Sequence, residues 1–435
     1  MGKGNMKFLI IGLLALVFIS GCAQSAPEEA SEEASEEVTE ALVEEIEIEI
    51  GVLADLSGPL TTYGEDIQTT VTIASEDVNA YFENKGMPYR VKLYIEDTKV
   101  DPKIALDKVM ALHAKGIKLI VGPMGSGEVK NILPYISSNK IVIASPSSTA
   151  PPSFLGVTKP DEKKFASRFV AGDAFQTIAI AKLAQDKGVK GVVITHVANA
   201  WGAGLEEFGT SEFEKLGIEV KSSVEYPDPA PADFTPYVAT LESTVEELLE
   251  TNSKDEVAVV AFSYEEVGTI LAQVDDDSVL LTVIWIGCDG TAKSQKVIDD
   301  VSDKASLVKL YSTVSETHGG SELDELKVKY AARIGGEPKS YGLNAYDSAF
   351  VIAIAAADVF DIYNEFNTDE IAISVPFVAE KYSAGDYGPK PVSGALNFDV
   401  WLDRAVTEYI IYSVEDQNWK ESGVWEFKTN TINWN

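Results

Sequence analysis

The 435-residue sequence is poor in cysteine and histidine, with 2 of the former and 3 of the latter. Cys22 lies in the N-terminal segment, so Cys288 has no partner in the rest of the chain, and a disulfide framework is excluded. The sequence has no HExxH motif, no Cys/His metal spacing and no G-x-S-x-G motif. We therefore predict neither an enzyme nor a metal or cofactor site. His196, which follows a predicted strand, is the one catalytic candidate, and a structural histidine is the interpretation that we favour.

Positive charge is also scarce, because 35 lysines and arginines stand against 69 acidic residues and give a formal net charge of -34. Nucleic acids and anionic membrane surfaces attract proteins through basic faces. We therefore expect neither of them as a partner, and we interpret the acidity as a feature that favours solubility.

The first 22 residues have the order of a lipoprotein signal peptide. Lys3 and Lys7 precede an apolar run over residues 8–19, and the small residues before Cys22 complete the pattern. The run is shorter than the roughly 20 residues that span a bilayer. We expect cleavage before Cys22 and lipid attachment to this cysteine, with an uncleaved anchor helix as the alternative. Both interpretations predict an extracytoplasmic protein held at the cell membrane, in a periplasm or on the outer surface.

Residues 28–49 read EEASEEASEEVTEALVEEIEIE, a low-complexity acidic tract that contains no aromatic residue, and the predicted tether comprises residues 23–46. Such a segment buries too little apolar surface to fold, and its like charges extend it. We predict a disordered tether between the lipid and the folded body.

The remaining sequence alternates apolar runs with stretches of helical periodicity, which indicates an α/β protein with parallel strands covered on both faces. The predicted strands lie at residues 48–53, 91–95, 117–121, 141–144, 192–195, 257–262, 280–286 and 307–314. About 390 residues are too many for one core, so we predict two lobes. The first comprises residues 47–168 and 313–388, and the second comprises residues 169–312 and 389–435. Residues 341–360 predict one long helix, and residues 394–414 predict an antiparallel hairpin.

Candidate ligand-binding residues follow the predicted strands, because open α/β sheets bind ligands beyond the carboxyl ends of their strands. In the first half, the loops GPMGSG (residues 122–127) and SPSSTAPP (residues 145–152) offer hydroxyls and backbone N–H groups. These groups suit a carboxylate at a helix start. Ordinary turns and N-caps are the alternative for either loop.

The second half supplies aromatic and acidic residues at the corresponding places. Trp201, Tyr264 and Asp289 each follow a predicted strand. If the two series face one another across a cleft, hydroxyls meet one end of a ligand while Asp289 meets an ammonium group, which describes a zwitterion. An acidic turn residue before Gly290, and aromatics that belong to the core, are the alternatives.

Several motifs in one order resemble the branched-chain amino-acid (Leu/Ile/Val)-binding family of type I periplasmic solute-binding proteins of ABC transporters. The stretches that carry the resemblance are IGVLADLSGP (50–59), YG (63–64), ED (96–97), DP (101–102), GPMGS (122–126), SPSST (145–149), WGAG (201–204), AYD (345–347) and GALNFD (394–399). The resemblance implies two lobes, each with a mostly parallel sheet covered by helices, joined by three hinge crossings and closing on a ligand.

The resemblance also implies a set of ligand-binding residues. Ser126 and Thr149 match positions that hold the carboxylate of an amino acid, the backbone at Ser147 and the Thr149 hydroxyl match contacts to its ammonium, and Asp289 matches the acidic partner. The full set of expected ligand-binding residues is Tyr63, Gly125, Ser126, Ser147, Ser148, Thr149, Trp201, Ser263, Tyr264 and Asp289.

Two departures concern the ligand's side chain, because Asp289 stands where family members often carry glutamate and Trp201 stands where tyrosine is common. The resemblance predicts transport of a branched-chain or related amino acid, with an ABC permease and ATPase as partners. A ligand-sensing subunit for a membrane receptor, or a binder of an amide or aromatic acid, is the alternative.

Overall fold

The computed structural model describes residues 45–316 and 319–435. The predicted signal peptide, the lipidation site Cys22 and nearly all of the predicted tether lie outside the described residues. Among the helices that the structure describes, none is long and apolar enough to cross a membrane.

The first sheet is entirely parallel and has the strand order β2-β1-β3-β4-β5. Its strands are β1 (Ile46–Ala54), β2 (Tyr89–Asp97), β3 (Leu119–Val121), β4 (Val142–Ser145) and β5 (Ala166–Arg168). Strands β3 and β4 are buried along their whole length, as parallel strands between two helical layers must be.

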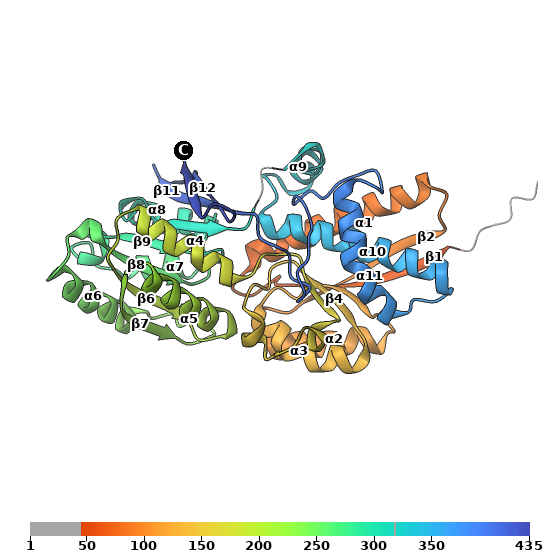
Figure 1. Cartoon of the computed structure of the whole chain (residues 1–435), viewed down its shortest axis with the longest axis horizontal. Helices are drawn as coiled ribbons and strands as arrows, with labels where there is room; N and C mark the ends of the chain where they lie inside the picture. The colour runs from red at the N-terminus through yellow and green to blue at the C-terminus, as the bar shows by residue number, and fades with distance from the viewer. Residues whose placement is uncertain (1–44, 317–318) are drawn as a thin grey trace, which may run out of the picture. The chain divides into compact units, whose positions relative to one another are not determined.

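Helices cover both faces of the first sheet, with α1, α10 and α11 on one side and α2 and α3 on the other (Figure 1). They are α1 (Thr61–Asn84), α2 (Pro102–Ala114), α3 (Ser126–Asn139), α10 (Ser340–Tyr363) and α11 (Thr368–Ala384), and α9 (Ser321–Ile334) packs against α1. Helix α2 shows the local causes of helix formation. Asp101 caps it by accepting from the N–H groups of Lys103 and Ile104, at 2.7 and 2.9 Å, and Pro102 opens the first turn.

The second sheet has the order β7-β6-β8-β9-β10-β11-β12-β13. It is parallel from β7 to β10 and antiparallel from β10 to β13. The strands are β6 (Gly191–Val197), β7 (Glu219–Tyr226), β8 (Val257–Phe262), β9 (Ile284–Gly287), β10 (Tyr311–Val314), β11 (Glu408–Glu415), β12 (Asn418–Glu426) and β13 (Thr431–Trp434).

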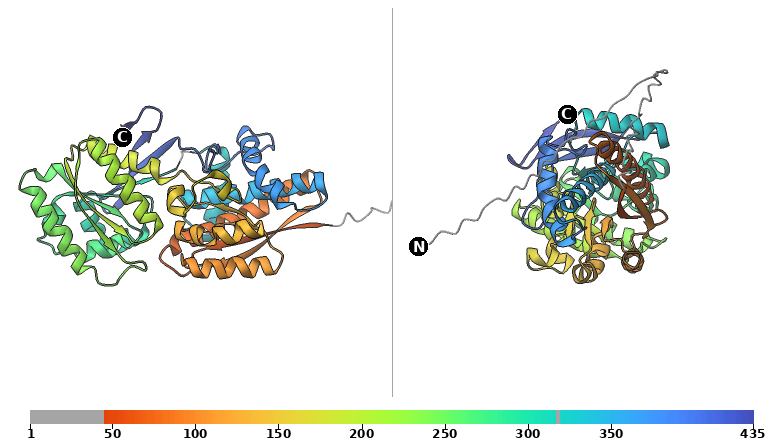
Figure 2. Two further views of the ribbon diagram at one scale, coloured as in Figure 1. Left: turned by 60° about the horizontal axis from the view of Figure 1, so that its bottom comes forward. Right: turned by 90° about the vertical axis from the view of Figure 1, so that its right-hand side faces the viewer.

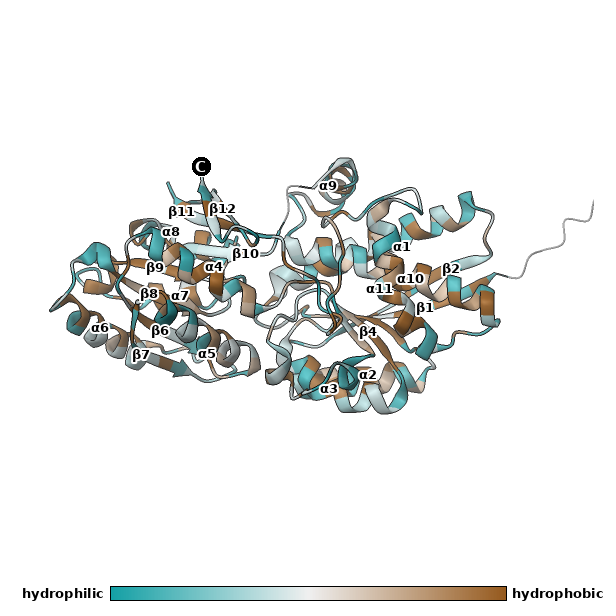
Figure 3. Cartoon of the chain, viewed as in Figure 1, coloured by the Kyte–Doolittle hydropathy of each residue, from teal (hydrophilic) through white to brown (hydrophobic). Residues whose placement is uncertain are grey.

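Five helices accompany this sheet, with α4 packed beside α5 and α7 beside α8. They are α4 (Asp173–Asp186), α5 (Ala200–Lys215), α6 (Thr235–Leu249), α7 (Val267–Ala272) and α8 (Gln295–Leu307). The part of the chain that the structure describes also contains short 3-10 turns: η1 (Pro152–Leu155), η2 (Pro160–Lys163), η3 (Lys254–Glu256) and η4 (Val279–Thr282). Hydrophobic residues dominate central strands such as β4 and β8, and hydrophilic residues are frequent on the outer helices (Figure 3).

Within the described residues the chain passes between the two sheets three times: from β5 to α4, from β10 to α9, and from α11 to β11 (Figure 2). A buried ionic cluster ties the first of these connections to the third. The Arg168 guanidinium donates to both carboxylate oxygens of Asp403, and the buried Lys163 ammonium lies 2.8 Å from the same carboxylate. Backbone bonds support the cluster, with the Arg168 N–H donating to the Leu402 carbonyl at 2.8 Å.

Several sequence predictions need correction. The strands predicted at 280–286 and 307–314 begin later, because Val279–Thr282 forms a 3-10 turn and α8 continues to Leu307. The antiparallel hairpin predicted over residues 394–414 was wrong in position. It is formed by β11 and β12, and its turn residues Asp416 and Gln417 adopt positive φ angles of 51° and 63°, as hairpin turns of the primed types require.

Candidate functional site

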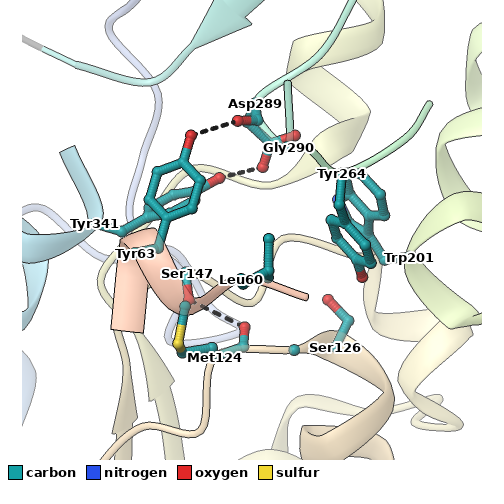
Figure 4. Close-up of a pocket in the computed structure, with 11 residues that line it drawn as sticks. Leu60, Tyr63, Met124, Ser126, Ser147, Trp201, Tyr264, Asp289, Gly290 and Tyr341 are labelled. Atoms are coloured by element: carbon teal, nitrogen blue, oxygen red, sulfur yellow. Dashed lines mark hydrogen bonds between the residues drawn. The ribbon is translucent and has the colours of Figure 1, made fainter. Parts of the chain in front are cut away.

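A pocket lies between loops that belong to the two sheets (Figure 4), and the empty space around it, open solvent included, is about 350 Å³. The residues that line it are Leu60, Tyr63, Met124, Gly125, Ser126, Ser147, Trp201, Tyr264, Asp289, Gly290 and Tyr341.

Ser126 forms one wall, at the first turn of α3. Its hydroxyl oxygen accepts from the Ser148 hydroxyl and from the Ala150 N–H, both at 3.1 Å. No described residue accepts the Ser126 proton, so this hydroxyl can donate to a group in the pocket. The helix start adds a positive partial charge, and the wall therefore suits a carboxylate.

The loop after β4 supports this wall. The Ser147 hydroxyl donates to the Met124 carbonyl at 3.0 Å (Figure 4), so its own proton is already used. The Ser148 N–H donates to the Ser145 hydroxyl at 3.1 Å, which closes the turn. The Thr149 hydroxyl is buried and has no hydrogen-bond partner among the described residues.

Asp289 forms the opposite wall, in the loop that follows β9. Only 4% of the residue is exposed. The Tyr341 hydroxyl donates to its Oδ2 atom (Figure 4), whereas its Oδ1 atom has no partner among the described residues. Burial raises the pKa of the Asp289 carboxyl, and the bond from Tyr341 opposes the shift. A cation in the pocket would supply the missing partner.

Two aromatic rings form the side of the pocket. Trp201 and Tyr264 stack with centroids 4.4 Å apart and planes 8° from parallel. Asn199 positions both of them, because its side-chain oxygen caps α5 at the Trp201 N–H and its amide donates to the Tyr264 hydroxyl, at 3.1 and 3.3 Å. Gly290 permits the close packing, since a Cβ atom there would lie 2.5 Å from the Ser263 carbonyl oxygen and 2.7 Å from the Trp201 ring.

Tyr63 bridges the two sheets from α1. Its hydroxyl donates to the Ala292 carbonyl at 2.6 Å, and its ring packs on Tyr341 with centroids 5.4 Å apart. The pocket therefore has a floor of two tyrosines whose hydroxyls both point to the loop that carries Asp289 (Figure 4).

The structure brings seven of the ten expected ligand-binding residues to the pocket wall: Tyr63, Gly125, Ser126, Ser147, Trp201, Tyr264 and Asp289. Ser148, Thr149 and Ser263 do not line it and are buried behind the wall. His196 lies in the buried strand β6, with its ring nitrogen 3.3 Å from the Val197 carbonyl, and does not line the pocket.

Sequence reasoning missed Leu60, Met124, Gly290 and Tyr341 as lining residues. Tyr341 lies in the first turn of the long helix α10, which the sequence predicts well, but nothing local indicates that this turn faces Asp289. Gly290 was noted only as a turn residue, and its packing role depends on Trp201 from another loop.

Comparison with known proteins places the chain in a family. The model for the receptor family ligand binding region matches residues 66–373. The chain belongs to this family. Membership in this ligand-binding family makes the protein a binding protein rather than an enzyme.

Two similar sequences come from archaea. An uncharacterized protein of Methanocaldococcus jannaschii is 42% identical over 423 residues, which are 97% of this chain and 98% of that protein. The chemotactic signal transduction system substrate-binding protein BasB of Halobacterium salinarum is 30% identical over 186 residues, which are 41% of this chain and 43% of BasB.

Solved structures show that this family member has the fold of type I periplasmic binding proteins. The leucine-binding protein LivK of Thermotoga maritima matches with a TM-score of 0.73 at 20% identity, over 88% of this chain and 99% of LivK. The substrate-binding protein LivJ of Streptococcus pneumoniae, solved with isoleucine, matches with a TM-score of 0.68 at 19% identity, over 90% of this chain and 100% of LivJ. A solute-binding protein of R. palustris, solved with benzoate, matches with a TM-score of 0.69 at 12% identity, over 89% of this chain and 97% of that protein.

Proposed function

We propose that the protein is the extracytoplasmic solute-binding lipoprotein of an ABC importer, and that it binds a branched-chain or related amino acid between its two lobes. The proposal rests on the observation that the two walls of one pocket suit opposite charges on a ligand. Ser126 offers a hydroxyl donor on one wall, and Asp289 holds a buried oxygen without a partner on the other.

A zwitterion meets both demands. Its carboxylate accepts from Ser126 at the start of α3, and its ammonium donates to the Oδ1 atom of Asp289. A charge-assisted hydrogen bond of this kind contributes about 1.5–3 kcal/mol. An aromatic acid without an amino group would bring a second negative charge towards Asp289 and leave its oxygen unpaired, which costs binding energy.

The rest of the pocket suits an aliphatic side chain. Leu60, Met124 and the Trp201–Tyr264 stack present apolar surface between the two polar walls.

Hinge closure follows from the placement of the ligand contacts. A ligand shifts the equilibrium towards the closed state only by binding that state more tightly. Ser126 precedes the first connection between the sheets, and Asp289 follows it, so a ligand that contacts both residues stabilises the closed arrangement.

The test is calorimetric titration of the purified body, residues 45–435, with leucine and with two analogues. 4-Methylpentanoate lacks the amino group of leucine, and isopentylamine lacks its carboxylate. We expect leucine, isoleucine or valine to bind, and each analogue to bind at least tenfold more weakly because it leaves one wall unsatisfied. Binding of 4-methylpentanoate or benzoate more tightly than any amino acid would contradict the proposal.

The lipid anchor is tested separately. Mass spectrometry of the membrane-extracted protein should show a diacylated N-terminal Cys22, and Cys22→Ser should release the protein from the membrane. An N-terminus at Met1 with no lipid would argue for an uncleaved anchor helix instead.

A sensing role is the second candidate, because BasB, a relative over 186 residues, is described as part of a chemotactic signal transduction system. The same pocket would serve either role. Cross-linking of the lipid-anchored protein in its native membrane, followed by identification of the linked protein, separates them: a permease supports import, and a receptor supports sensing.

A further inference from the structure

The loop that follows β4 carries part of the polar wall of the pocket, and a buried side chain holds it from behind. Ser147 lines the pocket, and the Ser148 hydroxyl donates to the Ser126 hydroxyl oxygen. The Pro146 carbonyl, one residue before Ser147, accepts from the side-chain amide of Asn344 at 3.0 Å. Asn344 lies in α10 and is 2% exposed. The position of this wall therefore depends on a residue that does not line the pocket.

The Arg404 guanidinium fixes Asn344 in turn. Its Nη1 atom donates to the Asn344 side-chain oxygen at 3.0 Å and to the Ser393 hydroxyl at 2.9 Å, and its Nη2 atom donates to the Ser393 carbonyl at 2.5 Å. An inverted Asn344 amide would turn its N–H groups towards the guanidinium, which has only donors. Arg404 therefore sets the orientation in which Asn344 donates to Pro146.

Arg404 belongs to the connections between the two sheets. It lies in the third connection, from α11 to β11, and its N–H donates at 2.9 Å to the carbonyl of Arg168, where the first connection begins. The Arg168 guanidinium donates to the Ala150 carbonyl at 2.6 Å, at the other end of the same loop. Side chains anchored where the chain passes between the sheets thus hold both ends of the loop that follows β4.

The loop in turn controls the hydroxyl of Ser126. The Ser126 oxygen accepts from the Ser148 hydroxyl and from the Ala150 N–H, both of which belong to the loop. These two bonds occupy the lone pairs of the oxygen and leave its proton for a group in the pocket. A displaced loop would release the oxygen, and the hydroxyl would be free to turn away from the ligand.

We propose that Asn344 is a positioning residue of the ligand site, which holds the Pro146 carbonyl so that the loop keeps the Ser126 hydroxyl directed at the carboxylate of the ligand. The inference rests on the proposed binding of an amino acid. It differs from a purely structural role, because a structural role predicts lower stability alone. A positioning role predicts a loss of affinity that depends on the carboxylate of the ligand.

The first arm of the test needs no ligand. Asn344→Leu removes the donor to the Pro146 carbonyl, and Asn344→Asp removes it while keeping an acceptor for Arg404, with which the new carboxylate can form an ion pair. Hydrogen exchange of the peptide that covers residues 145–152, followed by mass spectrometry, should be about tenfold faster in both variants than in the wild type. Exchange at the wild-type rate in either variant would overturn the proposal.

The matched control is Asn79→Leu. Asn79 lies in α1, which covers the same sheet, and its side chain donates to the Val91 carbonyl and accepts from the Val91 N–H, at 3.2 and 2.7 Å. The control therefore removes an asparagine that bonds to backbone outside the pocket. It should leave the exchange of residues 145–152 unchanged. Equally fast exchange in the control would show a general loss of stability and would overturn the proposal.

The second arm is calorimetry at a temperature where circular dichroism shows each variant folded. Both Asn344 variants should bind leucine about tenfold more weakly than the wild type and the control. Isopentylamine, which has no carboxylate, should bind within about twofold of its wild-type affinity. Equal losses for the two ligands, or wild-type affinity for leucine, would overturn the positioning role.

A double-mutant cycle tests the route through the loop. Ser148→Ala removes one of the two donors to the Ser126 oxygen, so Asn344→Leu should weaken leucine binding much less in this background than in the wild type. Losses that multiply in full would overturn the proposed route. If the wild type gives no binding heat with leucine, that result counts against the proposed function, and the exchange arm still decides whether Asn344 positions the loop.

Discussion

Replacement of Asp289 by asparagine should weaken ligand binding and stabilise the protein at the same time. Asparagine keeps the size of the side chain and can still accept the hydrogen bond from Tyr341, so the shape of the pocket is preserved. The change removes the negative charge that we assign to the ammonium of the ligand.

The magnitude follows from the lost contact. Loss of a charge-assisted hydrogen bond costs about 1.5–3 kcal/mol, which is roughly a 10- to 150-fold rise in Kd. In the free protein the same change removes a buried carboxyl whose Oδ1 atom has no partner among the described residues. Removal of this buried, unpartnered oxygen should raise the free energy of unfolding by on the order of 1 kcal/mol.

The assay combines calorimetric titration with leucine and thermal unfolding of the ligand-free protein. Asp358→Asn is the matched control, because it removes a carboxyl outside the pocket and should leave Kd unchanged. A Kd for Asp289→Asn within twofold of the wild type would refute the role of Asp289 in binding. A lower Tm together with weaker binding would indicate that the carboxylate stabilises the fold, contrary to our reasoning.

Three further predictions concern other parts of the molecule. Burial raises the pKa of Glu128 to about 8, so the folded state holds this proton more tightly than the unfolded state does. The free energy of unfolding should therefore fall as pH rises from about 5 to 8, by at most about 1.4 kcal/mol per unit of pKa difference. In urea unfolding, Glu128→Gln should flatten this pH dependence, and an unchanged pH dependence would count against the prediction. Gly290→Ala should weaken leucine binding at least tenfold, because the added Cβ would meet the Trp201 ring, while the circular dichroism spectrum stays native. Wild-type affinity would show that the stacked Trp201 and Tyr264 rings can move. Asp403→Asn should lower the free energy of unfolding by about 3–5 kcal/mol, because it leaves the buried Arg168 without its ion pair. A decrease of less than about 1 kcal/mol in denaturant titration would contradict this prediction.

Much of the fold follows from local patterns. The run at 257–262 is a buried strand, because a fully covered parallel strand needs apolar residues on both faces. Residues 105, 109 and 112 point into the core from α2, as their helical spacing predicts. Strand β7 was missed, since at the edge of the sheet most of its residues are at least partly exposed and its pattern is weakly apolar.

The site was predicted in part for the same reason. Ser126 and Asp289 follow apolar strands, so the rule for parallel sheets points to them. Tyr341 follows no such rule. It lies 52 residues from the Asp289 carboxylate to which it donates.

Composition and periodicity by themselves determined the α/β class, the main strands and the polar loops at their carboxyl ends, because burial acts on short stretches of chain and leaves its pattern there. Only the tertiary structure decided which loops meet. The stack of Trp201 on Tyr264 and the bond from Tyr341 to Asp289 join segments that are distant in sequence. Their meeting depends on strand order and on the three connections between the sheets, which no single stretch of sequence encodes.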